Sequence, residues 1–150
     1  MRIAREFCFQ YFFHMQLPIF KELRDSYIQE KDDKAVIASI QEFKESTNTM
    51  LDENLNKYVL EIIQGTLEKY QEIEEVLSRY SKNWKISRLS KVDHTNLMLS
   101  TFELLYLKKT PVKVIINEAI EISKKYGTIE SSSFVNGILD KMAKTELNQA

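Results

Sequence analysis

The residue types that perform nucleophilic, acid–base or metal chemistry are sparse in this chain of 150 residues. Its two histidines, His14 and His94, lie far apart in the sequence, and its single cysteine, Cys8, sits in an apolar stretch. The sequence has no glycine-rich phosphate loop and no cluster of side chains with metal-ligand spacing. We therefore expect a protein that is not an enzyme and that needs no metal and no cofactor.

The start of the chain offers a different chemistry, the binding of RNA. An RNA-binding helix needs cations for phosphates and aromatic or amide groups for unpaired bases. Arg2 and Arg5 are three residues apart and therefore lie on nearly one face of a helix, where both guanidiniums could contact phosphates. The formal net charge is -1, so RNA affinity would have to come from such a local patch and not from the overall field of the protein.

The composition favours a helical scaffold for these residues. Apolar residues make up 43% and charged residues 29%, which is the balance of a folded globular chain. Only three glycines and two prolines interrupt it, so we expect few, long elements. The lone cysteine fits a reduced, cytoplasmic setting. We expect neither secretion nor membrane insertion, because no leader sequence and no membrane-length apolar run is found.

Apolar residues recur at three- and four-residue spacing along most of the chain, which predicts helices. The expected helical segments are residues 3–17, 34–46, 51–80, 90–107, 111–127 and 131–144. Residues 20–33 form a loop or a short helical piece, and residues 51–80 form one long helix or two abutting ones around Gly65. Trp84 and Ile86 belong to an apolar connection. Without repeats or linkers, residues 1–150 form a single domain, an all-α bundle of about six to seven helices.

Local signals predict where several of these helices begin and end. Ser90 followed by Asp93 resembles a capping box, and Thr110 before Pro111 places an N-cap hydroxyl ahead of a first-turn proline. The serines at 131–133 are expected to cap the last helix. Gly127 is interpreted as a helix end and Gly137 as a close contact between helices.

Four blocks of the sequence resemble the NusB family, in the order in which that family carries them. The most specific are PVKVIINEAIEISKKYG at residues 111–127 and SSSFVNGILDK at residues 131–141. Supporting blocks are ARE at residues 4–6 and SRLSKVDHTNLMLSTFEL at residues 87–104. The resemblance covers nearly the full length, although residues 19–57 match only in hydrophobic pattern.

The resemblance implies an all-helical, NusB-like fold of two packed helical subdomains and a role in transcription antitermination. Members of the family bind the boxA element of single-stranded nascent RNA together with NusE, the free form of a small-subunit ribosomal protein. That pair joins NusA, NusG and RNA polymerase to suppress termination in ribosomal RNA operons. The family includes monomers and dimers, so the resemblance implies a monomer or a homodimer.

The resemblance also implies which residues contact RNA. Phe134 could stack on a base, but FVNGIL also has ordinary core periodicity, so packing in the core is the alternative. Gln10 has an amide able to pair with a base edge, and Ser133 stands where relatives often have a basic residue. The implied RNA-binding positions are Arg2, Arg5, Gln10, Ser133, Phe134 and Asn136.

The implied partner surface for NusE contains Phe13 and Asp93, an aromatic anchor beside a carboxylate that could pair with a basic residue. Alternatively, Phe13 belongs to the core and Asp93 only caps its helix. Met1 and Ile3 occupy positions where relatives often carry arginines. This motivates an alternative function, a protein-interaction adaptor that binds NusE with little intrinsic RNA affinity.

Overall fold

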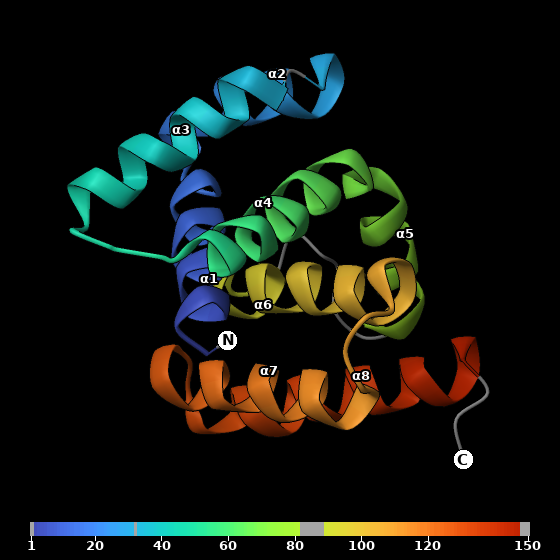
Figure 1. Cartoon of the computed structure of the whole chain (residues 1–150). Helices are drawn as coiled ribbons and strands as arrows, with labels where there is room; N and C mark the ends of the chain where they lie inside the picture. The colour runs from blue at the N-terminus through green and yellow to red at the C-terminus, as the bar shows by residue number, and fades with distance from the viewer. Residues whose placement is uncertain (1, 32, 82–88, 148–150) are drawn as a thin grey trace. The chain divides into compact units, whose positions relative to one another are not determined.

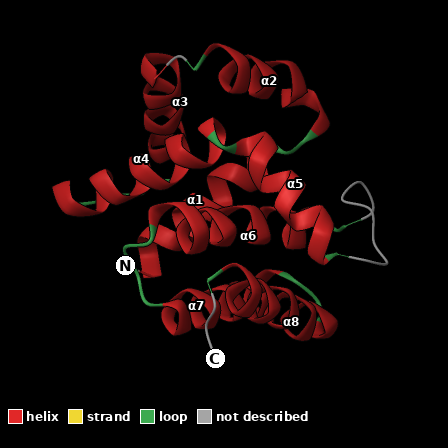
Figure 2. Cartoon of the chain, turned by 90° about the vertical axis from the view of Figure 1, so that its right-hand side faces the viewer, coloured by secondary structure: helices red, strands yellow, loops and turns green. Residues whose placement is uncertain are grey.

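The computed structural model describes residues 2–31, 33–81 and 89–147. These residues form helices joined by loops, and none of them is in a β-strand, as Figure 2 shows. The all-α expectation is therefore confirmed. The chain divides into two compact units, Met1–Glu68 and Lys69–Ala150, in agreement with the two helical subdomains that the resemblance implies.

The first unit contains four α-helices and one 3-10 turn in its described part. They are α1 (Arg2–Met15), η1 (Pro18–Phe20), α2 (Lys21–Glu30), α3 (Asp33–Ser46) and α4 (Glu53–Glu68) (Figure 1). α1 ends where expected, because Pro18 has no backbone N–H to continue a helix. The stretch expected to be a loop or a short helical piece forms the ten-residue helix α2, which ends at Lys31 in a left-handed conformation with φ 52°.

Aromatic side chains of α1 form the core of the first unit. Phe7 and Tyr11 each meet the ring of Phe43 on α3 edge to face, with ring centroids 5.6 Å apart in both pairs. His14 lies against the same ring at 5.3 Å and against Phe20 at 4.6 Å. Phe7, Tyr11 and His14 of the first helix thus help to hold α3 and η1 in place.

The second unit contains α5 (Tyr70–Tyr80), α6 (Lys91–Thr101), the π-helix η3 (Phe102–Leu107), α7 (Val112–Tyr126) and α8 (Ile129–Glu146). α7 and α8 form an antiparallel pair, drawn in orange and red in Figure 1. The apolar run from residue 51 to 80 is therefore two helices, and the break falls at Lys69 and not at Gly65, which lies inside α4.

The expected N-cap of α6 is confirmed, whereas that of α7 is wrong. The Ser90 hydroxyl accepts a hydrogen bond from the backbone N–H of Asp93 at 3.0 Å. At α7 the N-cap residue is Pro111, and no side chain caps the helix. The Thr110 hydroxyl instead donates to Oε2 of Glu103 at 3.4 Å, so it is drawn toward the preceding helix.

The last helix begins earlier than the serines at 131–133 suggest. Thr128 is its N-cap and Ser131 is the third helical residue of a capping box, in which the Thr128 backbone N–H donates to the Ser131 hydroxyl at 3.2 Å. A threonine cap outcompetes the serines because it pairs reciprocally with one of them. Trp84 and Ile86, which were expected in an apolar connection before α6, lie outside the described residues.

Gly127 is confirmed as a helix end, but the interpretation of Gly137 is wrong. Gly127 is the C-cap of α7, and a Cβ there would lie 2.7 Å from Oγ of Ser131 and 2.9 Å from the carbonyl oxygen of Ser123. Gly137 is exposed, and a Cβ built there would meet nothing within 4 Å. No close helix contact therefore requires a glycine at position 137.

A buried amide joins α6 to α7. Asn96 is 1% exposed, and its Nδ2 donates to the carbonyl oxygen of Ala119 at 2.8 Å and to Oγ of Ser123 at 3.1 Å. Because a buried amide that lacks partners is costly, this pair of bonds fixes the register of the two helices.

Candidate nucleic-acid interface

The two arginines of α1 differ in exposure. Arg2 is exposed at the start of the helix. Arg5 is only 7% exposed, and its guanidinium carbon lies 5.6 Å from the centroid of the Tyr58 ring on α4, which is the geometry of a cation–π contact. Gln10 is half-buried two turns further along the helix. Of this pair of arginines, Arg2 is therefore the one that presents its side chain to solvent.

The C-terminal candidates lie together on α8. Ser133 and Asn136 are exposed, as is Gly137, and they share one face of the helix. Phe134 is half-buried at the edge of that face. Because α8 begins at Ile129, Phe134 belongs to its second turn and lies beside the outer face of the helix rather than at its first free amides.

The outer face of α8 is not strongly basic. Glu130 is exposed in the first turn, and Asp140 is paired with Lys144 at 2.9 Å. A ligand on this face would meet hydroxyl, amide and aromatic groups before it meets cations. Arg2, Arg5 and Gln10 belong to the first unit, and Ser133, Phe134 and Asn136 belong to the second, so each set forms a surface of its own unit.

Phe13 and Asp93, the residues expected at a partner surface, are both half-buried. The Phe13 ring stacks on Phe9 one turn earlier, with centroids 5.8 Å apart and ring planes at 24°. Asp93 is in the first turn of α6, where Ser90 supplies the cap. Oδ1 of Asp93 is buried and has no hydrogen-bond partner among the described residues. Such an oxygen is costly unless a donor reaches it.

A histidine–glutamate contact lies next to Asp93. Nε2 of His94 is 3.1 Å from Oε2 of Glu74, which links α6 to α5 within the second unit. Neither Glu74 nor Tyr58, the partner of Arg5, can be recognised in the sequence. Each acts on a residue of another helix, and spacing within one helix carries no signal of such a contact.

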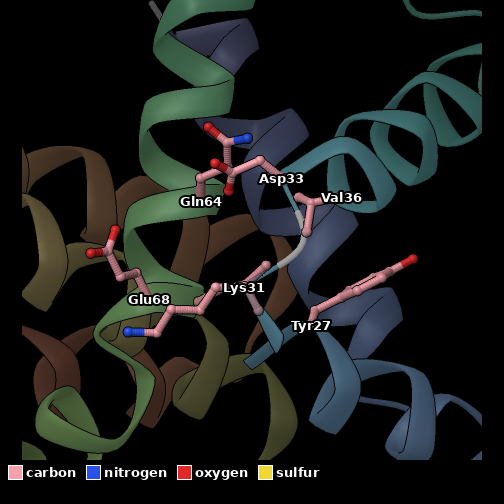
Figure 3. Close-up of a pocket in the computed structure, with 7 residues that line it drawn as sticks. Tyr27, Lys31, Asp33, Val36, Gln64 and Glu68 are labelled. Atoms are coloured by element: carbon pink, nitrogen blue, oxygen red, sulfur yellow. The ribbon is translucent and has the colours of Figure 1, made fainter. Parts of the chain in front are cut away.

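One pocket of the first unit is lined by residues of α2, α3 and α4 and by Lys31. It has a volume of about 180 Å³, and Figure 3 shows Gln64 and Glu68 of α4 facing Lys31 and Asp33 across it, with Tyr27 to one side. Its lining contains no cysteine, histidine or serine. In the described part of the chain no group of histidine, cysteine or acidic residues could hold a metal ion. The helices described there also lack the combination of length and hydropathy needed to cross a membrane.

The whole chain is similar to proteins of known family. A family model described as the NusB family matches residues 2–144. The transcription antitermination protein NusB of Thermodesulfovibrio yellowstonii is 34% identical over 148 residues, which cover 97% of this chain and 93% of that protein. The names of such relatives state a role in transcription and no catalysed reaction.

Solved structures agree with this similarity. The structure described as "T. maritima NusB, P3121, Form 2" has a TM-score of 0.78 at 34% identity and covers 97% of this chain and 91% of its own. A chain from "Crystal Structure of a Plectonemic RNA Supercoil" has a TM-score of 0.77 over 99% of this chain and 97% of its own. Because the two sequences are only 20% identical, this similarity shows that the two chains share a fold and nothing more.

Proposed function

The chain belongs to the NusB family, and from this premise we propose that it is a transcription antitermination factor that binds boxA RNA of ribosomal RNA operon transcripts together with NusE. In this role it would help RNA polymerase to read through terminators, in a complex with NusA and NusG. The family places the chain among transcription factors and not among enzymes.

The observation that carries the RNA-binding proposal is the environment of Phe134. A half-buried ring keeps its position without a ligand and still offers an edge or face to a base, and stacking of one base contributes about 1–3 kcal/mol. Ser133 and Asn136 beside it supply a hydroxyl and an amide for base edges or phosphates. The open space at Gly137 lets an RNA backbone approach the helix closely.

On α1 we assign the phosphate contact to Arg2 and a supporting role to Arg5. Arg2 is exposed, so its guanidinium can reach a phosphate without rearrangement of the core. Arg5, held over Tyr58, adds positive charge beneath that surface. Gln10 would contact RNA further along the same helix.

For NusE we propose two contact residues, Phe13 in the first unit and Asp93 in the second. Oδ1 of Asp93, which has no hydrogen-bond partner among the described residues, supports the assignment of Asp93, because a basic side chain of a ribosomal protein would supply a donor. Phe13 would add apolar contact area, since its ring is only half-buried against Phe9.

Fluorescence anisotropy of labelled boxA RNA, measured with the protein alone and with NusE, tests the proposal. We expect boxA to bind more tightly than a scrambled RNA, and NusE to tighten it further. Phe134→Ala should weaken binding about 5- to 150-fold, whereas Ile129→Ala, a change at a 92% exposed position of the same helix, should not. If neither the protein nor its complex with NusE prefers boxA to the scrambled RNA, the proposed function is wrong.

The alternative function, an adaptor that binds NusE with little intrinsic RNA affinity, is favoured by one observation. Burial of Arg5 leaves Arg2 as the exposed member of the arginine pair, which reduces the positive charge available to phosphates. The two functions predict different RNA binding by the isolated protein. The adaptor would bind NusE normally, as measured by calorimetry, but would show no salt-dependent binding of boxA RNA.

A further inference from the structure

A groove in the second unit, at the junction of η3 and α7, belongs to none of the surfaces described above. It has a volume of about 600 Å³, within the range of roughly 300–1,000 Å³ that ligand pockets occupy. Its floor is aliphatic and its rim carries two lysines. The lining includes Leu104, Lys108, Pro111, Val112, Lys113 and Leu147.

The backbone at the end of the π-helix brings Lys108 to this rim. Lys108 has φ 56°, a left-handed conformation that is uncommon for a residue with a side chain. Its backbone N–H donates to the carbonyl oxygen of Glu103 at 3.0 Å, five residues back, and closes the π-helix. π-Helical segments and strained residues of this kind are frequent at functional sites.

The groove is positively charged. Lys108 and Lys113 are exposed and make no ion pair with a described residue. α7 starts at the groove without a side-chain cap and without an acidic residue in its first turn, so its dipole adds to the positive charge.

Glu103 and Glu146, two acidic residues near the groove, form no ion pair with Lys108 or Lys113 and have other partners. Glu103 is 5% exposed and accepts a hydrogen bond from Thr110. Glu146 precedes Leu147 of the lining, but its carboxylate is 3.6 Å from the guanidinium of Arg79 and accepts a hydrogen bond from Tyr80 at 2.9 Å. The Glu146 carboxylate is therefore paired outside the groove, whereas that of Glu103 is buried and bonded to Thr110 of the lining.

We propose that this groove binds an acidic peptide segment of a partner protein, with apolar side chains on the aliphatic floor and carboxylates on Lys108 and Lys113. Charge complementarity selects an acidic partner. The floor selects a peptide over single-stranded RNA, because bases need aromatic platforms and the lining includes none. This site is independent of boxA binding, so it can stand or fail separately from the proposed function.

Anisotropy of a short fluorescein-labelled peptide that alternates Glu with Leu tests the proposal. The peptide should bind the wild-type protein, and Lys108→Gln with Lys113→Gln should weaken it about tenfold, as expected for the loss of two ion pairs at an interface rim. The matched control removes the same charge elsewhere in the unit, by Lys124→Gln with Lys144→Gln, and should bind nearly as wild type. Lys124 and Lys144 are exposed and lie on α7 and α8.

Two further arms keep the test decisive. Peptides with Lys in place of Glu, or Ser in place of Leu, should bind weakly, because they remove the charge or the apolar match. Glycine readily adopts the left-handed backbone conformation found at position 108, so the Lys108→Gly variant should remain folded. It should still bind the peptide less tightly than the wild type. The proposal would be overturned if the wild type, the Lys108→Gln/Lys113→Gln variant and the Lys108→Gly variant bound the Glu–Leu peptide with equal affinity. It would also be overturned if a labelled single-stranded RNA bound in a manner sensitive to Lys108 and Lys113 while the peptide did not bind.

Discussion

At the scale of single residues, Asn96 is a buried polar group that links two helices of the second unit, α6 and α7. Asn96→Ala removes two buried hydrogen bonds to α7 and leaves a small void, so the free energy of unfolding should fall by about 2–3 kcal/mol. Ser123→Ala removes one of these partners and should cost about 1 kcal/mol. Urea denaturation checks both values. Asn117→Ala on the exposed face of α7 is the control, and an Asn96 variant as stable as this control would contradict the assignment.

Tyr11 makes the stability of the first unit depend on alkaline pH. Burial raises the pKa of Tyr11 to about 12, although the hydrogen bond with Ser39 at 2.8 Å acts in the opposite direction. The pKa of a tyrosine in the unfolded chain is about 10. The folded state therefore keeps the proton of Tyr11 to higher pH than the unfolded chain does. The resulting contribution of Tyr11 to the free energy of unfolding is fully present below about pH 10 and is lost as the pH rises toward 12.

The variant Tyr11→Phe isolates this effect. At neutral pH it should be less stable than the wild type by about 1 kcal/mol, because the bond to Ser39 is lost. Between about pH 10 and 12 the wild type should lose about 2 kcal/mol more than the variant. Urea denaturation at a series of pH values measures the difference. Parallel loss of stability in both proteins would show that Tyr11 does not titrate as the structure implies.

At the scale of elements, Gly127, which ends α7, and Gly137, which lies inside α8, should respond oppositely to alanine. Gly137→Ala should stabilise the protein by about 0.5–1 kcal/mol, because a methyl group there has open space and a helix interior favours alanine. Gly127→Ala should destabilise it by about 1–3 kcal/mol, because the Cβ would press on Ser131 and on the carbonyl oxygen of Ser123.

Thermal and urea denaturation of the two glycine variants measures this contrast. Each variant controls for the other, since the chemical change is the same. Should both shift stability in the same direction, the difference in space around the two glycines would not be the cause. Gly137→Ala should in addition lower the affinity for boxA RNA if the RNA backbone approaches α8 at this position.

The elements that the sequence predicts well are those with a strong periodic apolar face. α1, α3 and α8 begin and end within a few residues of their expected limits, and the Ser90 cap is found because its signal is local. Thr110 was expected to cap α7, yet its hydroxyl turns to Glu103 on the preceding segment. Contacts of this kind are set by tertiary structure and leave no trace in spacing.

The candidate site is predictable to a smaller extent. Sequence resemblance names Arg2 and Arg5 together, but it cannot show that Tyr58 covers one of them and leaves the other exposed. It likewise places Phe134 without deciding between base stacking and core packing. The half-buried position in the structure leaves the ring accessible from one side, which is compatible with stacking.

At the scale of the whole molecule, charge is nearly balanced, and this limits how RNA can be attracted. With a formal net charge of -1, long-range attraction contributes little, so the salt dependence of binding must come from individual phosphate contacts. Each phosphate neutralised on single-stranded RNA changes the slope of log affinity against log salt by about -0.7. The protein alone should therefore show a shallow slope, and NusE should steepen it if it supplies further cations.

Two variants separate the electrostatic part of RNA binding from the stacking part. Arg2→Gln should reduce the magnitude of the salt slope by about 0.7, because it removes the phosphate contact proposed for Arg2. Phe134→Ala should lower boxA affinity at every salt concentration and leave the slope unchanged, because stacking releases no counterions. Lys34→Gln removes an exposed cation of α3 and should alter neither quantity. Anisotropy titrations across a salt series give affinity and slope together. A Phe134 variant that changed the slope as much as the Arg2 variant would mean that the ring holds the cationic surface in place and does not itself stack on RNA.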